Sequence, residues 1–128
     1  RDEGTSYHYL PPTREVAAHP KAISALKSTL DSNKIYYSLA KTWTTDAIYR
    51  ETPDKRLRRM EEGCEVVEME AAAFFAVAKF RKVVLGQLLY AGDLGIPKGW
   101  DGRKWNNRTA TRRLLFDLAV EAVVKLGN

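Results

Sequence analysis

Two carboxylates and a thioether are consecutive in the sequence at the expected boundary between a strand and a helix. Glu68, Met69 and Glu70 follow the β-type run Cys64 to Val67 and lead into an alanine-rich segment that favours helix. Open α/β sheets bind ligands outside the carboxyl ends of their strands, so these three side chains are candidate ligand contacts. Carboxylates in a first helical turn also compensate the helix dipole, and the spacing alone leaves both interpretations open.

Two more groups of residues occupy the same kind of position, directly after an expected strand. One follows the strand that ends near residue 45, and the other follows an apolar run that ends near residue 91. In a parallel sheet, residues at these places border the same crevice. The first group is Thr44, Thr45 and Asp46 with Ile48 and Tyr49, and the second is Gly92 with Asp93.

The strands that must position these residues are recognised by their β-branched, aromatic and apolar content. Ile35 to Thr45 alternates at period two, Cys64 to Val67 is short, and Val83 to Ala91 is typical of an interior parallel strand. A glycine-containing loop from Gly92 to Gly102 is expected after the last strand. Parallel sheets normally have more strands than these, so the sheet is expected to be incomplete.

Helices are expected between the strands and after the last one. Pro20 opens a helix that ends near Asn33, and Pro53 opens a charged helix that Gly63 closes. Residues 1–19 are polar and turn-rich and are expected to form a loop. This alternation predicts an α/β fold with a mostly parallel or mixed central sheet covered by helices. The last helix runs from Thr109 to Leu126, with an apolar face made of Leu115, Leu118, Ala119, Ala122, Val123 and Leu126.

The composition limits the possible classes of protein. The 128 residues are 45% hydrophobic and 29% charged, which suits one domain-sized core. No segment approaches the roughly 20 consecutive apolar residues of a membrane helix. The single cysteine, Cys64, cannot form an intramolecular disulfide and is expected to be a core thiol, so a reducing, cytoplasmic setting is expected.

The charge balance permits an anionic partner without pointing to one. The net charge is +5, but the basic residues are spread over separate segments, which favours solvated helix faces over a nucleic-acid-binding surface. His8 and His19 lack further ligands at metal spacing, so no metal site is expected. A basic binding module without catalytic activity remains an alternative.

The run VEMEAAAFFAVA resembles the signature of the nucleoside phosphorylase and nucleosidase family, which includes bacterial purine nucleoside and uridine phosphorylases. TTDAIYRE is similar to the segment of that family that lines the base pocket, and LLYAGD to the strand whose last aspartate faces the purine. RDEGTSYHYLPP resembles a base-side stretch in some members. The resemblance covers most of residues 1–93 and implies cleavage of the N-glycosidic bond of a nucleoside.

The resemblance also implies roles for the candidate residues. Glu70 would accept hydrogen bonds from the ribose 2′ and 3′ hydroxyls, Met69 would lie against the apolar face of the sugar, and Glu68 would help to hold the sugar side. Asp93 would protonate or hydrogen-bond purine N7 as the base leaves. Such groups suit a reaction that passes through an oxocarbenium-like sugar. The residues expected in the base pocket are Thr45, Ile48 and Tyr49.

The identity of the base is less sharply implied. Asp93 favours a purine. Uridine-selective members carry a glutamine and arginine pair after the aromatic residue of the base segment, whereas this sequence has Arg50 and Glu51 there. Because Arg50 could act from a shifted position, uridine remains the alternative base.

The nucleophile is not identified either. In the resembled family, glycine-rich backbone and arginines of the amino-terminal half bind the attacking phosphate, and no such glycine-rich loop precedes Glu68. We therefore expect residues 1–128 to be the carboxyl-terminal part of one phosphorylase-like domain, without its amino-terminal phosphate-binding part. The start at Arg1, without an initiator methionine, favours the same interpretation.

The expected activity of the full-length form is phosphorolysis of a nucleoside to free base and ribose 1-phosphate. Phosphate would be a co-substrate, and no cofactor is expected. The resemblance implies a homo-oligomer, either a hexamer or a dimer, and no membrane partner. The alternatives are hydrolysis by water, as in a nucleosidase, and a truncated relative that keeps the fold without turnover.

Overall fold

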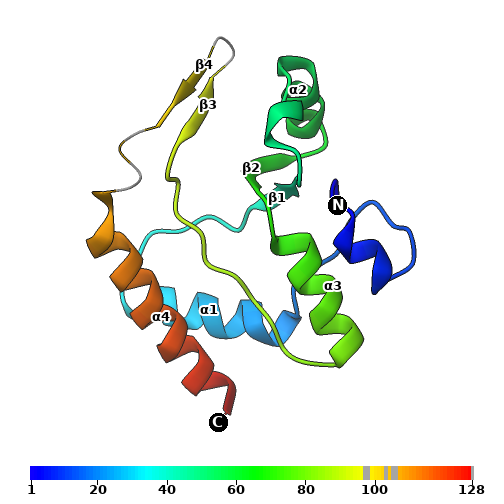
Figure 1. The fold of residues 1–128 in the computed structure, drawn as a ribbon. Coiled ribbons are helices and arrows are strands. Elements are labelled where there is room, and N and C mark those ends of the chain that lie inside the picture. Colours follow the sequence, from blue (N-terminus) through cyan, green and yellow to red (C-terminus); the bar gives the residue numbers. More distant parts are fainter. Residues whose placement is uncertain (97–98, 103, 105–106, 128) are drawn as a thin grey trace. The chain divides into compact units, whose positions relative to one another are not determined.

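The computed structural model describes residues 1–96, 99–102, 104 and 107–127 (Figure 1). The chain divides into two compact units, each with its own helices and strands. The first unit comprises Arg1–His19 and Ser38–Gly86, and the second comprises Pro20–Tyr37 and Gln87–Asn128.

The first unit is built around two parallel strands, β1 (Lys41–Thr44) and β2 (Cys64–Glu68). Their register shifts between Lys41 and Thr42 and then places Thr44 opposite Glu68, so the two carboxyl ends are level. The parallel pairing expected of these segments is confirmed. It brings two of the three candidate groups to one edge of the sheet.

Two α-helices and two 3₁₀-helices accompany this strand pair. The charged helix α2 (Pro53–Glu61) starts with proline after the N-cap Thr52, and it ends before Gly63, whose φ of +84° suits glycine. The helix α3 (Ala71–Arg81) follows β2 and buries several alanines, as the alanine-rich sequence predicts. The 3₁₀-helices are η1 (Thr5–His8) and η2 (Ile48–Arg50).

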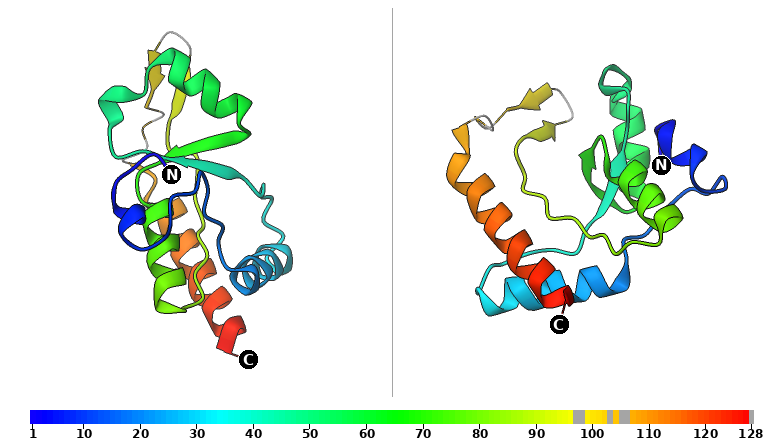
Figure 2. Two further views of the ribbon diagram at one scale, coloured as in Figure 1. Left: turned by 90° about the vertical axis from the view of Figure 1, so that its right-hand side faces the viewer. Right: turned by 60° about the horizontal axis from the view of Figure 1, so that its bottom comes forward.

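The second unit is formed by α1 (Pro20–Ser32), α4 (Thr109–Gly127) and a small hairpin. The helices α1 and α4 pack against each other (Figure 2), and both were expected at these places. Leu30 of α1 and Leu118 of α4 are buried. The strands β3 (Leu94–Ile96) and β4 (Gly99–Asp101) pair antiparallel. No helix of the described residues is both long enough and apolar enough to cross a membrane.

The prediction of a strand from Val83 to Ala91 is wrong, because residues 83–91 form neither strand nor helix. Their composition is of β type, but a strand also needs a neighbour that shares backbone hydrogen bonds with it. The Leu85 carbonyl accepts a hydrogen bond from the His19 N–H at 3.1 Å, yet residues 83–91 join no strand ladder of the described residues.

The structure also corrects the expected extent of the first strand and the expected loop after residue 91. The strand expected from Ile35 to Thr45 is confined to β1, and residues 35–40 are irregular, with Tyr36 95% exposed. The loop expected from Gly92 to Gly102 contains β3 and β4, because backbone pairing between neighbouring segments does not need alternating apolar side chains. Residues 1–19 form a loop apart from η1.

The apolar face expected on the last helix is narrower than its sequence predicts. Leu118 and Ala122 of α4 are buried, in agreement with the prediction. Val123 is 65% exposed and Leu126 is 36% exposed, so they contribute less to the core of the second unit. A single partner helix, α1, covers only part of an apolar face of this width.

Candidate functional site

The carboxyl end of β2, which pairs with β1, leads directly into the amino end of α3. Glu68 is the last residue of β2, and its carboxylate accepts hydrogen bonds from the backbone N–H of Glu70, at 2.8 Å, and from that of Ala71. Backbone N–H groups at a helix start have no partner within the helix, and a carboxylate both satisfies them and compensates the dipole. Glu68 therefore caps α3 from outside the helix.

The neighbouring candidates, Met69 and Glu70, present their side chains to solvent. Glu70 is the N-cap residue of α3, but its side chain makes no capping hydrogen bond. The Glu70 side chain is exposed, and Met69 is 40% exposed. Glu68 and Glu70 were both expected near the first turn of the helix, and only Glu68 caps α3. The carboxylate of Glu70 remains accessible to a ligand.

The candidates for the base pocket have different surroundings. Thr45 is fully buried, its hydroxyl accepts a hydrogen bond from the Ala47 N–H at 3.2 Å, and its own N–H donates to the Glu68 carbonyl at 3.0 Å. Ile48 and Tyr49 belong to η2 and are 56% and 97% exposed. The structure thus joins Thr45 to β2 and places the Tyr49 ring at the surface of the first unit.

The first residues of the chain run along the end of β1. The Asp2 N–H donates to the Thr44 carbonyl at 2.9 Å, and Asp2 forms a parallel bridge with Thr45. The Gly4 N–H donates to the Asp46 carboxylate at 3.0 Å. These bonds place a third segment beside the carboxyl end of β1.

A carboxylate in that segment is buried. Glu3 is 8% exposed and accepts hydrogen bonds from the N–H of Ser6, at 2.9 Å, and from its hydroxyl. Arg1 Nε donates to the same hydroxyl at 2.9 Å. The pairing fixes the start of η1, and no sequence pattern predicted it.

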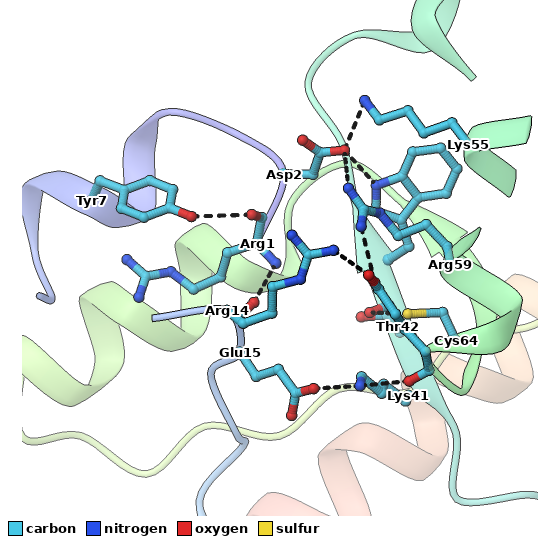
Figure 3. Close-up of polar contacts among 12 residues, drawn as sticks. Arg1, Asp2, Tyr7, Arg14, Glu15, Lys41, Thr42, Lys55, Arg59 and Cys64 are labelled. Carbon is cyan, nitrogen blue, oxygen red and sulfur yellow. Dashed lines mark hydrogen bonds and ion pairs between the residues drawn. The ribbon is translucent and has the colours of Figure 1, made fainter. Parts of the chain in front are cut away.

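Two cationic side chains of α2 and a tryptophan of β1 meet on the carboxylate of Asp2 (Figure 3). Asp2 Oδ2 lies 2.8 Å from Lys55 Nζ, and it accepts hydrogen bonds from Arg59 Nη2 and Trp43 Nε1, each at 3.0 Å. Both cationic groups also lie over the Trp43 ring, which is 4% exposed. The basic residues of α2 were expected to form a solvated face, whereas these two hold the amino-terminal segment against β1 and α2.

Further ion pairs extend this cluster over the surface of the first unit. Arg59 Nη1 bonds to Glu62 at 2.9 Å, and Glu62 also pairs with Arg14 (Figure 3). The Lys41 ammonium pairs with Glu15. The hydrogen bond from Arg59 holds the pKa of Glu62 below its usual value against a smaller effect of burial.

The contacts of Asp2 favour the ionised form of its carboxyl group. Burial opposes ionisation of its carboxyl group, but the hydrogen bonds from Lys55, Arg59 and Trp43 outweigh that effect and lower the pKa of Asp2 to about 2. Because the pKa is lower in the folded than in the unfolded state, Asp2 stabilises the fold above pH 4, and this contribution disappears as the pH falls towards 2.

Replacement of Asp2 by asparagine should therefore destabilise the chain only while Asp2 is ionised. We expect a loss of about 1 kcal/mol in the free energy of unfolding at pH 6, after allowance for solvent screening of a partly exposed carboxylate. Urea unfolding of both proteins at several pH values measures the difference. It should shrink between about pH 4 and pH 2, and a difference that stays constant across this range would contradict the assignment.

The last candidate, Asp93, belongs to the second unit and lies just before β3 with an exposed side chain. The structure brings together Thr45, Glu68, Met69 and Glu70 within the first unit. Over the described parts of the chain, no three histidine, cysteine, aspartate or glutamate side chains are grouped as metal ligands. Cys64 is half-buried, and its Sγ lies 3.7 Å from the Thr42 carbonyl oxygen (Figure 3).

Comparison with known proteins identifies the family. A family model described as the phosphorylase superfamily matches residues 1–123. The chain belongs to the phosphorylase superfamily. The family indicated by the run VEMEAAAFFAVA is thereby confirmed. No curated protein gives a significant match to the sequence.

A solved structure has the same fold. The crystal structure of AMP nucleosidase from Bacteroides thetaiotaomicron VPI-5482 superposes on 98% of this phosphorylase-superfamily chain with a TM-score of 0.72 and 22% sequence identity. The predicted α/β class is confirmed by this likeness. The match covers 48% of the AMP nucleosidase chain, so the present chain spans about half of its length.

Proposed function

We propose that this chain carries the sugar- and base-binding residues of an enzyme that cleaves the N-glycosidic bond of a nucleoside, with a purine as the favoured base and phosphate as the acceptor. The observation that carries the proposal is the accessible carboxylate of Glu70 at the carboxyl edge of two parallel strands. Membership of the phosphorylase superfamily supports the reaction class.

The chemistry assigned to each residue is what the resemblance to the phosphorylase and nucleosidase family implies. Glu70 accepts hydrogen bonds from the ribose 2′ and 3′ hydroxyls, for which a carboxylate offers two acceptor oxygens. Met69 is 40% exposed beside it and contacts the apolar face of the sugar. Asp93 stabilises the leaving base by donating a proton or a hydrogen bond to N7. The base contacts Ile48 and Tyr49 beside the buried Thr45.

Hydrolysis is the second candidate reaction. The observation that favours it is the likeness in fold to an AMP nucleosidase, since a nucleosidase transfers the sugar to water. Both reactions demand the same stabilisation of an oxocarbenium-like sugar, and they differ in the nucleophile alone. The same likeness makes a nucleotide such as AMP a substrate to be compared with nucleosides.

The reaction is tested by product analysis with the full-length protein. Inosine, adenosine, AMP and uridine are each incubated with the protein, with and without phosphate, and free base, ribose 1-phosphate and ribose (or their 5-phosphorylated forms from AMP) are separated. Phosphate-dependent release of a purine with formation of ribose 1-phosphate supports the proposal. Free ribose at equal rates without phosphate identifies hydrolysis, faster release of uracil corrects the base, and no release from any substrate overturns both reactions.

The proposal includes no cofactor other than phosphate as a co-substrate, and it places the reaction in the cytoplasm. We also propose a homo-oligomer, a hexamer or a dimer, as the working form. Sedimentation of the full-length protein measures this directly, and a monomer at micromolar concentration would contradict it.

A further inference from the structure

The side chains of Thr44 and Glu68 meet at the start of α3. The Thr44 hydroxyl donates a hydrogen bond to Glu68 Oε1, and the same hydroxyl accepts one from the Ala72 N–H at 3.0 Å. Glu68 Oε2 accepts from the N–H groups of Glu70, at 2.8 Å, and Ala71. Two side chains thus satisfy three consecutive backbone donors.

This arrangement is built into the core of the first unit. Thr44 is 2% exposed, and the parallel register places it directly opposite Glu68. A hydrogen-bonded chain from a carboxylate through a buried hydroxyl to a backbone N–H gains strength from the low local dielectric. The backbone of residues 70–72 is therefore fixed by contacts with β1 and β2 as well as by the helix itself.

We propose that Thr44 and Glu68 are positioning residues that set the place of the Glu70 carboxylate. This inference rests on the proposed role of Glu70 as the group that binds the sugar hydroxyls. The Glu70 side chain makes no capping bond, so its position depends on the backbone from which it projects. Glu68 accordingly acts on the sugar through the backbone of residue 70, and Thr44 acts through Glu68 and Ala72.

The first test does not depend on activity. Amide hydrogen exchange at residues 70–72 is measured by NMR in the full-length protein and in its Thr44→Val variant, which keeps the shape of the side chain and removes the hydroxyl. We expect exchange at these three amides to become about tenfold faster or more, because their acceptors are lost or displaced. Thr44→Ser should restore slow exchange, and Thr42→Val on the same strand should leave it unchanged.

A second variant, Glu68→Gln, tests the same hydrogen bonds in case Thr44→Val does not fold. Glu68→Gln replaces the charged carboxylate by a neutral amide, whose oxygen accepts more weakly from the backbone N–H groups and whose NH₂ group cannot accept from the Thr44 hydroxyl. It should accelerate exchange at residues 70 and 71. Unchanged exchange at residues 70–72 in both Thr44→Val and Glu68→Gln would overturn the capping assignment.

The second test asks whether the pair acts through Glu70. We expect Thr44→Val to lower kcat/KM for the nucleoside about tenfold and to raise its KM, since a displaced carboxylate binds the sugar less well. A loss of folded protein would lower kcat without raising KM. In a Glu70→Ala background, which has no side-chain acceptor left to displace, the same substitution should have no further effect, whereas independent, multiplying losses would overturn the proposal.

The two proposals fail in different ways. If the unaltered protein releases no base from any nucleoside, the proposed function is wrong and the positioning role falls with it. If base release is normal and Thr44→Val leaves both kcat and KM unchanged, the positioning role is wrong and the proposed function stands.

Discussion

Replacement of Glu70 by alanine should lower kcat/KM for nucleoside cleavage by about 100-fold or more. Hydrogen bonds to a charged group contribute about 1.5–3 kcal/mol each, and two such bonds to the sugar are lost together. Glu70 is available for these bonds because its side chain is exposed and does not cap α3. Initial rates of base release at several nucleoside concentrations give both kinetic constants.

Two companion variants locate the effect in the Glu70 carboxylate. Glu70→Gln keeps the size of the side chain and an acceptor oxygen, so it should retain part of the activity that alanine removes. Glu65→Gln removes a negative charge from the exposed side of β2 and should leave kcat/KM within about twofold, as expected for a surface carboxylate. Activity of Glu70→Ala within a factor of two of the unaltered protein would exclude Glu70 from sugar binding.

Replacement of Asp93 by asparagine should lower kcat about 10²- to 10⁴-fold if this residue transfers a proton to the leaving base. Asparagine keeps the shape of the side chain and can donate a hydrogen bond, but it cannot act as a general acid. Stopped assays that quantify free purine measure the change. Asp117→Asn is a suitable control, because Asp117 forms an exposed ion pair with Arg113 on α4.

The atom that receives the proton is tested with a modified substrate. A 7-deazapurine nucleoside has carbon in place of N7, so it cannot accept the proton or the hydrogen bond. We expect it to react slowly with the unaltered protein and equally slowly with Asp93→Asn. If Asp93→Asn slows the 7-deaza substrate as much as it slows the natural one, Asp93 does not act at N7.

The helices could be predicted from the sequence because their signals are local. Pro20 and Pro53 stand at first helical positions, and Gly63 ends the charged helix with a backbone angle that suits glycine. The alanine-rich run forms α3 as expected. Local signals of this kind depend on residues within a few positions of each other, so no knowledge of the tertiary structure is required.

The strands could be predicted only in part, because a strand is defined by its partner. Cys64 to Val67 pairs with Lys41–Thr44, and both segments were expected to be strands. Residues 83–91 have an equally suitable composition, yet they pair with no strand among the described residues. Periodicity describes which faces of a segment are apolar and cannot specify a hydrogen-bonding neighbour.

The ion cluster on Asp2 could not be predicted from the sequence either, because its partners are distant in the chain. Asp2 and Arg59 are 57 residues apart, and the charges of α2 resemble an ordinary solvated face. An aspartate near a basic helix becomes a structural partner only when the chain brings it there. Its low pKa is a property of that placement.

The sequence alone determined the family, the helices and the run in which Glu68, Met69 and Glu70 stand together, since each is encoded by neighbouring residues. Only the tertiary structure decided that Glu68 caps α3 and that Glu70 remains exposed. Thr44 and Glu68 are 24 residues apart, and only the parallel register of β1 and β2 brings them into contact. That contact holds the Glu68 carboxylate at the start of α3, where the unpaired backbone donors need acceptors, and Glu70 stays accessible.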